Sequence, residues 1–200
     1  MSDETTDGHK EEKQKVQAEK RAQRRELVDP GRGLVLVNTG KGKGKTTAAM
    51  GVLVRAMGWG QTVGVVQFIK GKWMTGERKF FEEAGVAWHS MGEGFTWDTQ
   101  DRERDVAAAQ AAFAKARAMM ESGDFDLVLL DEINIAMRYD YLSVEEVLAA
   151  LDARHERTSV MLTGRDAKPE LCARADLVTE MTLVKHPMEA GFKAQRGLDY

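Results

Sequence analysis

The chain has 200 residues, a length that suits one α/β domain with a substantial core. Its 29 lysines and arginines and 32 aspartates and glutamates leave a net charge of −3, whereas proteins that bind nucleic acid over a broad surface are usually basic. A single cysteine, Cys172, excludes an internal disulfide and a multi-cysteine metal site, and it fits a reducing compartment. No apolar run approaches the ~18 residues of a membrane span, and the polar start shows no secretory signal.

Residues 1–30 differ in composition from the rest and are predicted to be a flexible N-terminal arm. They hold seven lysines or arginines and eight acidic residues but few apolar ones, too few for the segment to order itself alone. Residues 10–26 lack Pro and Gly, so they can become helical against a surface. Two interpretations remain open: a solvated tail, or an arm that folds over a ligand or a neighbouring subunit. Pro30 and Gly31 mark the boundary with the domain at 31–200.

From residue 33 onward, patterns typical of buried strands alternate with patterns typical of helices. In chain order we predict a strand at 33–38, a helix at 45–58, a strand at 62–69, a helix at 77–84, a third strand at 86–91, a helix at 101–121, a strand at 125–130, a helix opened by a capping box of Ser143 and Glu146, and strands at 159–162 and 177–184. Strands that are apolar on both faces and separated by helices favour a mostly parallel sheet with helices on either side.

The most informative segment runs from Asn38 to Thr47 and reads NTGKGKGKTT. Its glycines let successive backbone N–H groups turn towards an anion, and the start of a helix adds partial positive charge. Lys45 supplies a cation for phosphate oxygens, and Thr46 places a hydroxyl where Mg²⁺ would bind. Thr39 stands where the pattern G-x-x-x-x-G-K-[ST] has its first glycine, so the strict pattern fails at one position. The alternative is a flexible glycine turn, but the strand before it and the helix after it favour nucleotide binding.

A second part of the site is predicted where the strand at 125–130 ends, at Asp131 and Glu132. Ligands of open α/β sheets bind at the carboxyl ends of the strands. A carboxylate at that edge can hold Mg²⁺ directly or through water, although a pair of acids can also simply cap a helix. Together with the glycine-rich loop, the pair predicts a metal site made by Asp131, Glu132 and Thr46.

A third segment, GFTWDTQ at 94–100, places Phe95 and Trp97 in a glycine-flanked stretch. In an extended chain the two rings lie on one side, because side chains alternate. They either plug the core or form a platform for a large, flat, partly apolar ligand. The residues alone leave both interpretations open.

These segments resemble the P-loop type of corrinoid adenosyltransferase, the ATP:cob(I)alamin adenosyltransferases. The resemblance covers nearly the whole chain. It includes, in order, GKGKGKTTAA (40–49), VGVVQFIKG (63–71), GE (76–77), GFTWDTQ (94–100), VLLDE (128–132), YDYL (139–142), TGR (163–165), VKH (184–186) and AGFKAQRGLDY (190–200). So many segments in one order are more specific than the loop alone, and the family's pattern also accommodates Thr39.

The resemblance implies a RecA-like P-loop fold and transfer of the 5′-deoxyadenosyl group of ATP to the Co(I) of a corrinoid, with release of triphosphate. It further implies a cytoplasmic homodimer, a reduced flavoprotein as electron donor, and an N-terminal helix that covers the partner subunit's active site. Phe95 and Trp97 would press on the corrinoid and displace its lower ligand. The expected catalytic residues are Lys45, Phe95 and Trp97, and the expected nucleotide-binding residues are Gly40, Lys41, Gly42, Lys43, Gly44, Lys45, Thr46, Thr47 and Arg165.

Two other functions use the same loop, because a phosphate loop alone does not name the reaction. In a RecA-like ATPase acting in a protein or nucleic-acid complex, Glu132 would orient a water. The acidic charge balance and the aromatic segment argue against that function. A small-molecule kinase would need an acceptor-hydroxyl site and usually a mobile arginine lid, for which the sequence gives no sign.

Overall fold

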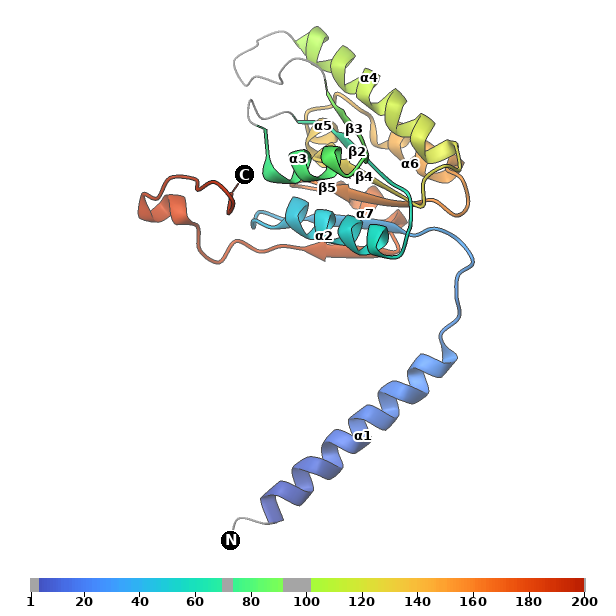
Figure 1. Ribbon diagram of the computed structural model, residues 1–200, viewed down its shortest axis with the longest axis vertical. Helices are drawn as coiled ribbons and strands as arrows, with labels where there is room; N and C mark the ends of the chain where they lie inside the picture. The colour runs from blue at the N-terminus through green and yellow to red at the C-terminus, as the bar shows by residue number, and fades with distance from the viewer. Residues whose placement is uncertain (1–3, 70–73, 92–101, 200) are drawn as a thin grey trace. The chain divides into compact units, whose positions relative to one another are not determined.

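The computed structural model describes residues 4–69, 74–91 and 102–199 (Figure 1). The chain divides into two compact units, Met1–Gly31 and Arg32–Tyr200. The first unit contains one helix, α1 (Glu4–Glu26), which spans the segment without Pro and Gly noted at 10–26. Its described side chains, and those of Leu27 and Val28 after it, are exposed. The unit therefore has no core of its own among the described residues.

The second unit is built on a sheet of six strands in the order β3-β2-β4-β5-β1-β6. Every neighbouring pair is parallel, which confirms the predicted α/β fold with a mostly parallel sheet flanked by helices. The strands are β1 (Val35–Thr39), β2 (Val63–Gln67), β3 (Ala87–Ser90), β4 (Leu127–Asp131), β5 (Ser159–Thr163) and β6 (Leu177–Glu180). Because all the strands run the same way, their carboxyl ends lie on one edge, where ligands of such sheets bind.

Helices cover both faces of this sheet (Figure 1). The helices are α2 (Lys45–Gly58), α3 (Gly76–Glu83), α4 (Arg102–Glu121), α5 (Ile133–Arg138), α6 (Val144–Ala153) and α7 (Pro169–Arg174), followed by a short 3-10 helix, η1 (Pro187–Ala190). One apolar cluster packs α2 and α3 against the sheet, and a larger one packs α4 to α7 against the opposite face. The capping box predicted at Ser143 and Glu146 is present at the start of α6. Among the described helices, none combines the length and apolar character needed to cross a membrane.

Several elements differ from the sequence-based prediction, among them the last strand and the short helices α5 and η1. The last strand was predicted to span 177–184, but β6 ends at Glu180. Beyond it, Met181 bonds the glycine-rich loop instead of extending the strand: its N–H donates to the Thr39 carbonyl at 2.9 Å, and its carbonyl accepts from the Gly42 N–H at 2.7 Å. The short helix α5 was not predicted, because its six residues are too few to show a helical period.

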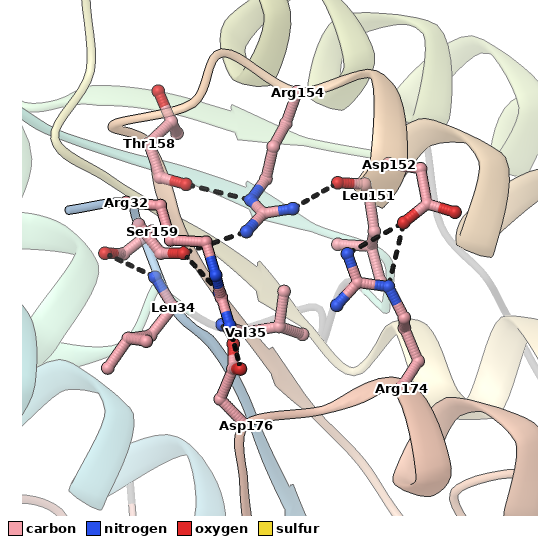
Figure 2. A network of polar contacts seen from close by, with 11 residues as sticks. Arg32, Leu34, Val35, Leu151, Asp152, Arg154, Thr158, Ser159, Arg174 and Asp176 are labelled. Carbon is pink, nitrogen blue, oxygen red and sulfur yellow. Dashed lines mark hydrogen bonds and ion pairs between the residues drawn. The ribbon is translucent and has the colours of Figure 1, made fainter. Parts of the chain in front are cut away.

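A polar network at the opposite end of the strands joins the start of β1 to the neighbouring segments (Figure 2). The Arg154 guanidinium donates to the carbonyls of Gly33 at 2.9 Å and Thr158 at 3.1 Å, and also to that of Leu151. One arginine thus ties together three stretches of backbone through their carbonyls.

Asp176, just before β6, completes this network. Its carboxylate accepts from the Val35 N–H at 2.8 Å and from two nitrogens of Arg32 at 2.9 and 2.5 Å (Figure 2). The Arg32 hydrogen bonds, followed by that of the Val35 N–H, hold the pKa of Asp176 well below its ordinary value. Asp176 therefore anchors the edge strand β6 to β1 through a charged side chain.

Candidate active site

The glycine-rich loop connects β1 to α2 and wraps around the ammonium group of Lys45. Gly40 and Gly44 have φ values of 95° and 108°, a region that favours glycine, and Gly44 is the N-cap of α2. Lys45 is 6% exposed, and its Nζ donates to the carbonyls of Gly40 at 2.9 Å and Gly42 at 2.6 Å. Burial lowers the pKa of Lys45. These neutral carbonyls hold the cation at the start of a helix, where phosphate oxygens bind readily.

Side chains behind the loop hold its two ends. The Asn38 amide donates to the Lys45 carbonyl at 3.1 Å, which ties the end of β1 to the first turn of α2. Thr39, the departure from the strict loop pattern, accepts the Ala167 N–H on its hydroxyl at 3.0 Å. A glycine at this position would lack that bond, so Thr39 has a structural task of its own.

Asp131, at the end of β4, is almost completely buried and accepts hydrogen bonds from three sides. Its Oδ1 accepts from the hydroxyls of Thr46 at 2.9 Å and Thr163 at 2.8 Å, and its Oδ2 accepts from the Gln67 amide at 3.1 Å. Burial raises the pKa of Asp131, and these hydrogen bonds oppose the shift. Both carboxylate oxygens of Asp131 accept hydrogen bonds from protein donors. Asp131 is therefore better placed to orient the Thr46 hydroxyl than to bind a cation directly.

Glu132 has a different environment, although it is the next residue. Its backbone lies in the left-handed region at φ 60°, and its N–H donates to the Thr163 hydroxyl at 2.9 Å. Its Oε2 is buried and accepts no hydrogen bond from the described residues. Burial, and next the charge of Asp131, raise the pKa of Glu132 from 4.5 to about 7. A buried carboxylate oxygen without a donor is suited to a cation.

These groups face one cavity of about 320 Å³ at the carboxyl edge of the sheet. Of the residues predicted from the sequence, it is lined by Gly42, Lys43, Gly44, Lys45, Thr46, Thr47, Asp131, Glu132 and Arg165. Arg165 is exposed at its rim. Gly40 and Lys41 line a separate cavity of about 730 Å³ on the other side of the loop. The predicted aromatic residues Phe95 and Trp97 lie outside the described residues.

The cavity also contains residues that the sequence analysis did not single out, namely Gln67, Thr75, Glu77 and Asp199. Gln67 had a readable signal, because it is a polar residue that ends an otherwise apolar strand, as Asp131 does. Asp199 had none. It comes from the far end of the chain, and its carboxylate forms an ion pair with Lys43 of the loop.

A parallel sheet that brings a phosphate loop and a buried carboxylate pair to one cavity defines a P-loop nucleotide-binding protein. The family model described as ATP:corrinoid adenosyltransferase BtuR/CobO/CobP matches residues 31–200. The chain therefore belongs to the ATP:corrinoid adenosyltransferase family, as the resemblance predicted.

Individual relatives agree with this assignment. The chain is 50% identical to a corrinoid adenosyltransferase of Pseudomonas aeruginosa, over 95% of this chain and 93% of the relative. It is 50% identical to that of Escherichia coli K12 and 49% identical to corrinoid adenosyltransferase CobA of Salmonella typhimurium, each over 84% of this chain and 86% of the relative. Among solved structures, the RadB recombinase superposes with a TM-score of 0.44 at 18% identity, covering 77% of each chain.

Proposed function

We propose that the 320 Å³ cavity holds the triphosphate of ATP while the 5′-deoxyadenosyl group passes to the Co(I) of a corrinoid, the activity of this chain's family. In that reaction cobalt attacks C5′, the bond between C5′ and its oxygen breaks, and the electron pair leaves with the triphosphate. Co(I) is itself a strong nucleophile, so the protein needs no nucleophilic side chain. The observation that carries the proposal is that Lys45 faces the same cavity as the Glu132 carboxylate, whose buried Oε2 accepts no hydrogen bond from the described part of the chain.

The task left to the protein is to stabilise the charge that develops on the departing triphosphate. Lys45 is already held within the loop by two carbonyls, so it needs only a small displacement to contact phosphate oxygens. The start of α2 contributes backbone N–H groups, and Lys43 and Arg165 add cations at the rim. The loop backbone and the start of α2 are in place before the substrate arrives, which is the condition under which electrostatic stabilisation is most effective.

The residues present fit a magnesium ion. Glu132 offers a buried carboxylate oxygen without a donor, and the Thr46 hydroxyl donates to Asp131, which leaves its lone pairs for a cation. Glu132 and Thr46 would hold the ion directly, and Asp131 would orient Thr46. When bound, Mg²⁺ would supply positive charge beside the leaving phosphates.

The remaining features follow from family membership and are part of the proposal. Phe95 and Trp97 contact the corrinoid and replace its lower ligand, which excludes water without coordinating cobalt. The enzyme acts as a homodimer in the cytoplasm, with the helix α1 of one protomer covering the active site of its partner, and it receives electrons from a reduced flavoprotein.

The proposal is tested by supplying ATP, MgCl₂ and chemically reduced cobalamin and following the absorbance of adenosylcobalamin. Wild-type protein forms the product, and Lys45→Met lowers kcat about 100-fold or more, because it removes a cation that acts on the leaving group. Lys115→Met, which removes an exposed lysine on α4, serves as the matched control and retains wild-type activity. An active Lys45→Met variant would contradict the assigned role of the loop.

A further inference from the structure

A row of polar side chains crosses three neighbouring strands at the carboxyl edge of the sheet. In the strand register, Ser90 of β3 pairs with Gln67 of β2, and Gln67 pairs with Asp131 of β4. Each of these residues ends its strand. Three aligned polar positions at the ends of apolar strands place a hydrogen-bonding path beside the cavity that contains Gln67 and Asp131.

The hydrogen bonds along this row run in one direction. The Trp88 indole N–H donates to the Ser90 hydroxyl at 3.1 Å, Ser90 donates to the Gln67 carbonyl oxygen at 3.4 Å, and the Gln67 amide donates to Asp131 Oδ2 at 3.1 Å. An indole N–H can only donate, and an ionised carboxylate can only accept. The two ends therefore determine the order of donors between them, including the side of the Gln67 amide that faces Asp131.

The first member of the path is itself held by packing. The Trp88 ring stacks on Phe81 of α3 with centroids 6.2 Å apart, and Phe81 is 1% exposed. The last member, Asp131, has its other oxygen occupied by Thr46 and Thr163. Gln67 is the only described donor to Asp131 Oδ2, so loss of its amide would free one side of this carboxylate to rotate.

We propose that Trp88, Ser90 and Gln67 are positioning residues that hold Asp131, and through it Thr46, in the orientation required for binding a divalent cation in the phosphate cavity. The inference rests on the magnesium site of the proposed function. Residues that orient the partners of a metal typically change metal affinity 10–100-fold when substituted. They leave the phosphate-binding loop itself intact, because the loop is held by Asn38 and Thr39 instead.

The test measures Mn²⁺ binding to the full chain with inorganic tripolyphosphate, which has no 5′-deoxyadenosyl group to transfer, by the electron paramagnetic resonance signal of free Mn²⁺, corrected by a protein-free titration for the Mn²⁺ that tripolyphosphate binds in solution. Gln67→Met, which keeps the length but removes the amide, weakens Mn²⁺ binding about tenfold or more. Trp88→Phe and Ser90→Ala produce smaller losses. Tripolyphosphate affinity without metal, measured by calorimetry, stays at the wild-type value. The double variant Gln67→Met/Trp88→Phe binds no worse than Gln67→Met, because both break one path.

Gln110→Met is the matched control, since it removes a glutamine amide that donates to Glu146 and the Tyr141 carbonyl. Unchanged Mn²⁺ affinity in Gln67→Met, or an equal loss in Gln110→Met, overturns the positioning role. Additive losses in the double variant overturn the single path. If the wild-type chain binds tripolyphosphate but no Mn²⁺, the proposed metal site is wrong, and the positioning role is wrong with it. If Mn²⁺ binds equally well to wild type and to Gln67→Met, the metal site stands and only the positioning role is wrong.

Discussion

Asp131 and Glu132 are adjacent in sequence but have different surroundings, and the difference separates their tasks. Asp131 accepts from three side chains, whereas the buried Oε2 of Glu132 accepts from none of the described residues. The left-handed backbone of Glu132 turns the chain between the two residues; the Thr163 hydroxyl accepts from the Glu132 N–H and donates to the Asp131 carboxylate, but the two side chains have different surroundings. One carboxylate therefore orients the site, and the other is available to a cation.

The pKa of Glu132 predicts a pH dependence of metal binding. Because Glu132 titrates near pH 7 in the ligand-free protein, a cation competes with a proton below that value. Mn²⁺ affinity in the presence of tripolyphosphate should rise about fivefold from pH 6 to pH 7, reach about tenfold by pH 8 and level off above that value. Glu132→Gln should bind Mn²⁺ weakly, with an affinity that does not change with pH. A wild-type affinity that is constant over this pH range would contradict the assignment of Glu132 as a metal ligand.

The same carboxyl affects stability. Its pKa is higher in the folded chain than the ordinary 4.5, so the folded state binds the proton more tightly and stability falls as pH rises from about 4.5 to 7. Glu132→Gln should therefore stabilise the ligand-free protein by about 1–3 kcal/mol at pH 8 and have little effect at pH 4. Thermal unfolding of both proteins at the two pH values measures this, and a less stable variant at pH 8 would contradict the expectation.

At the scale of elements, the C-terminal segment places a negative charge beside the phosphate loop. The Asp199 carboxylate lines the cavity, forms an ion pair with Lys43, and accepts the Gln195 N–H at 2.8 Å. The pKa of Asp199 is lowered chiefly by Lys43. A polyphosphate in the cavity must therefore compete with this carboxylate for the lysine.

Removing that charge should strengthen polyphosphate binding. Asp199→Asn is expected to bind inorganic tripolyphosphate about threefold to tenfold more tightly at low salt, an effect that diminishes as salt screens the exposed charges. Isothermal titration calorimetry at two salt concentrations measures the change. Glu189→Gln, in the exposed helix η1, removes an equal charge from the same segment and should have a smaller effect. Weaker binding by Asp199→Asn would show that the carboxylate supports the site.

A second element-scale prediction concerns the edge strand β6, which Asp176 ties to β1. The pKa of Asp176 is lowered in the folded chain, so its contribution to stability is present above its ordinary pKa of 3.8 and is lost as pH falls below that value. Asp176→Asn should cost about 1 kcal/mol at pH 7, a modest amount because the group is partly solvated, and a smaller amount at pH 3, where the unfolded chain is mostly protonated at this position but the folded chain still is not. Thermal unfolding should show a smaller loss of stability at pH 7 for Asp152→Asn, because the Asp152 carboxylate is more exposed than that of Asp176. Equal losses at both pH values would contradict the ionic origin.

At the scale of the whole molecule, the sequence was sufficient where the signal lay in adjacent residues. The strand, loop and helix around Lys45 follow one another, and so do β4 and its two acids, so the sheet class and the position of the two carboxylates beside the loop were predictable. Arg165 was placed correctly beside the cavity because it follows a buried strand, as ligand-binding residues of such sheets do.

Features that depend on strand order could not be predicted in this way. The path from Trp88 to Asp131 exists only because β2 lies between β3 and β4 in register, which no local pattern specifies. The contact of Asp199 with Lys43 joins residues 156 positions apart, and neither shows a periodic or motif signal for it. The end of β6 was misplaced because Met181 bonds the loop, a tertiary contact that overrides the apolar run after it.

The loop around Lys45 is proposed to hold a triphosphate that leaves intact when C5′ is attacked. A decisive experiment is ³¹P nuclear magnetic resonance of a reaction that contains the wild-type protein, ATP, Mg²⁺ and chemically reduced cobalamin. We expect inorganic triphosphate in equal amount to the adenosylcobalamin formed, without ADP. Consumption of ATP to ADP and phosphate, with no alkylated corrinoid, would contradict the proposal.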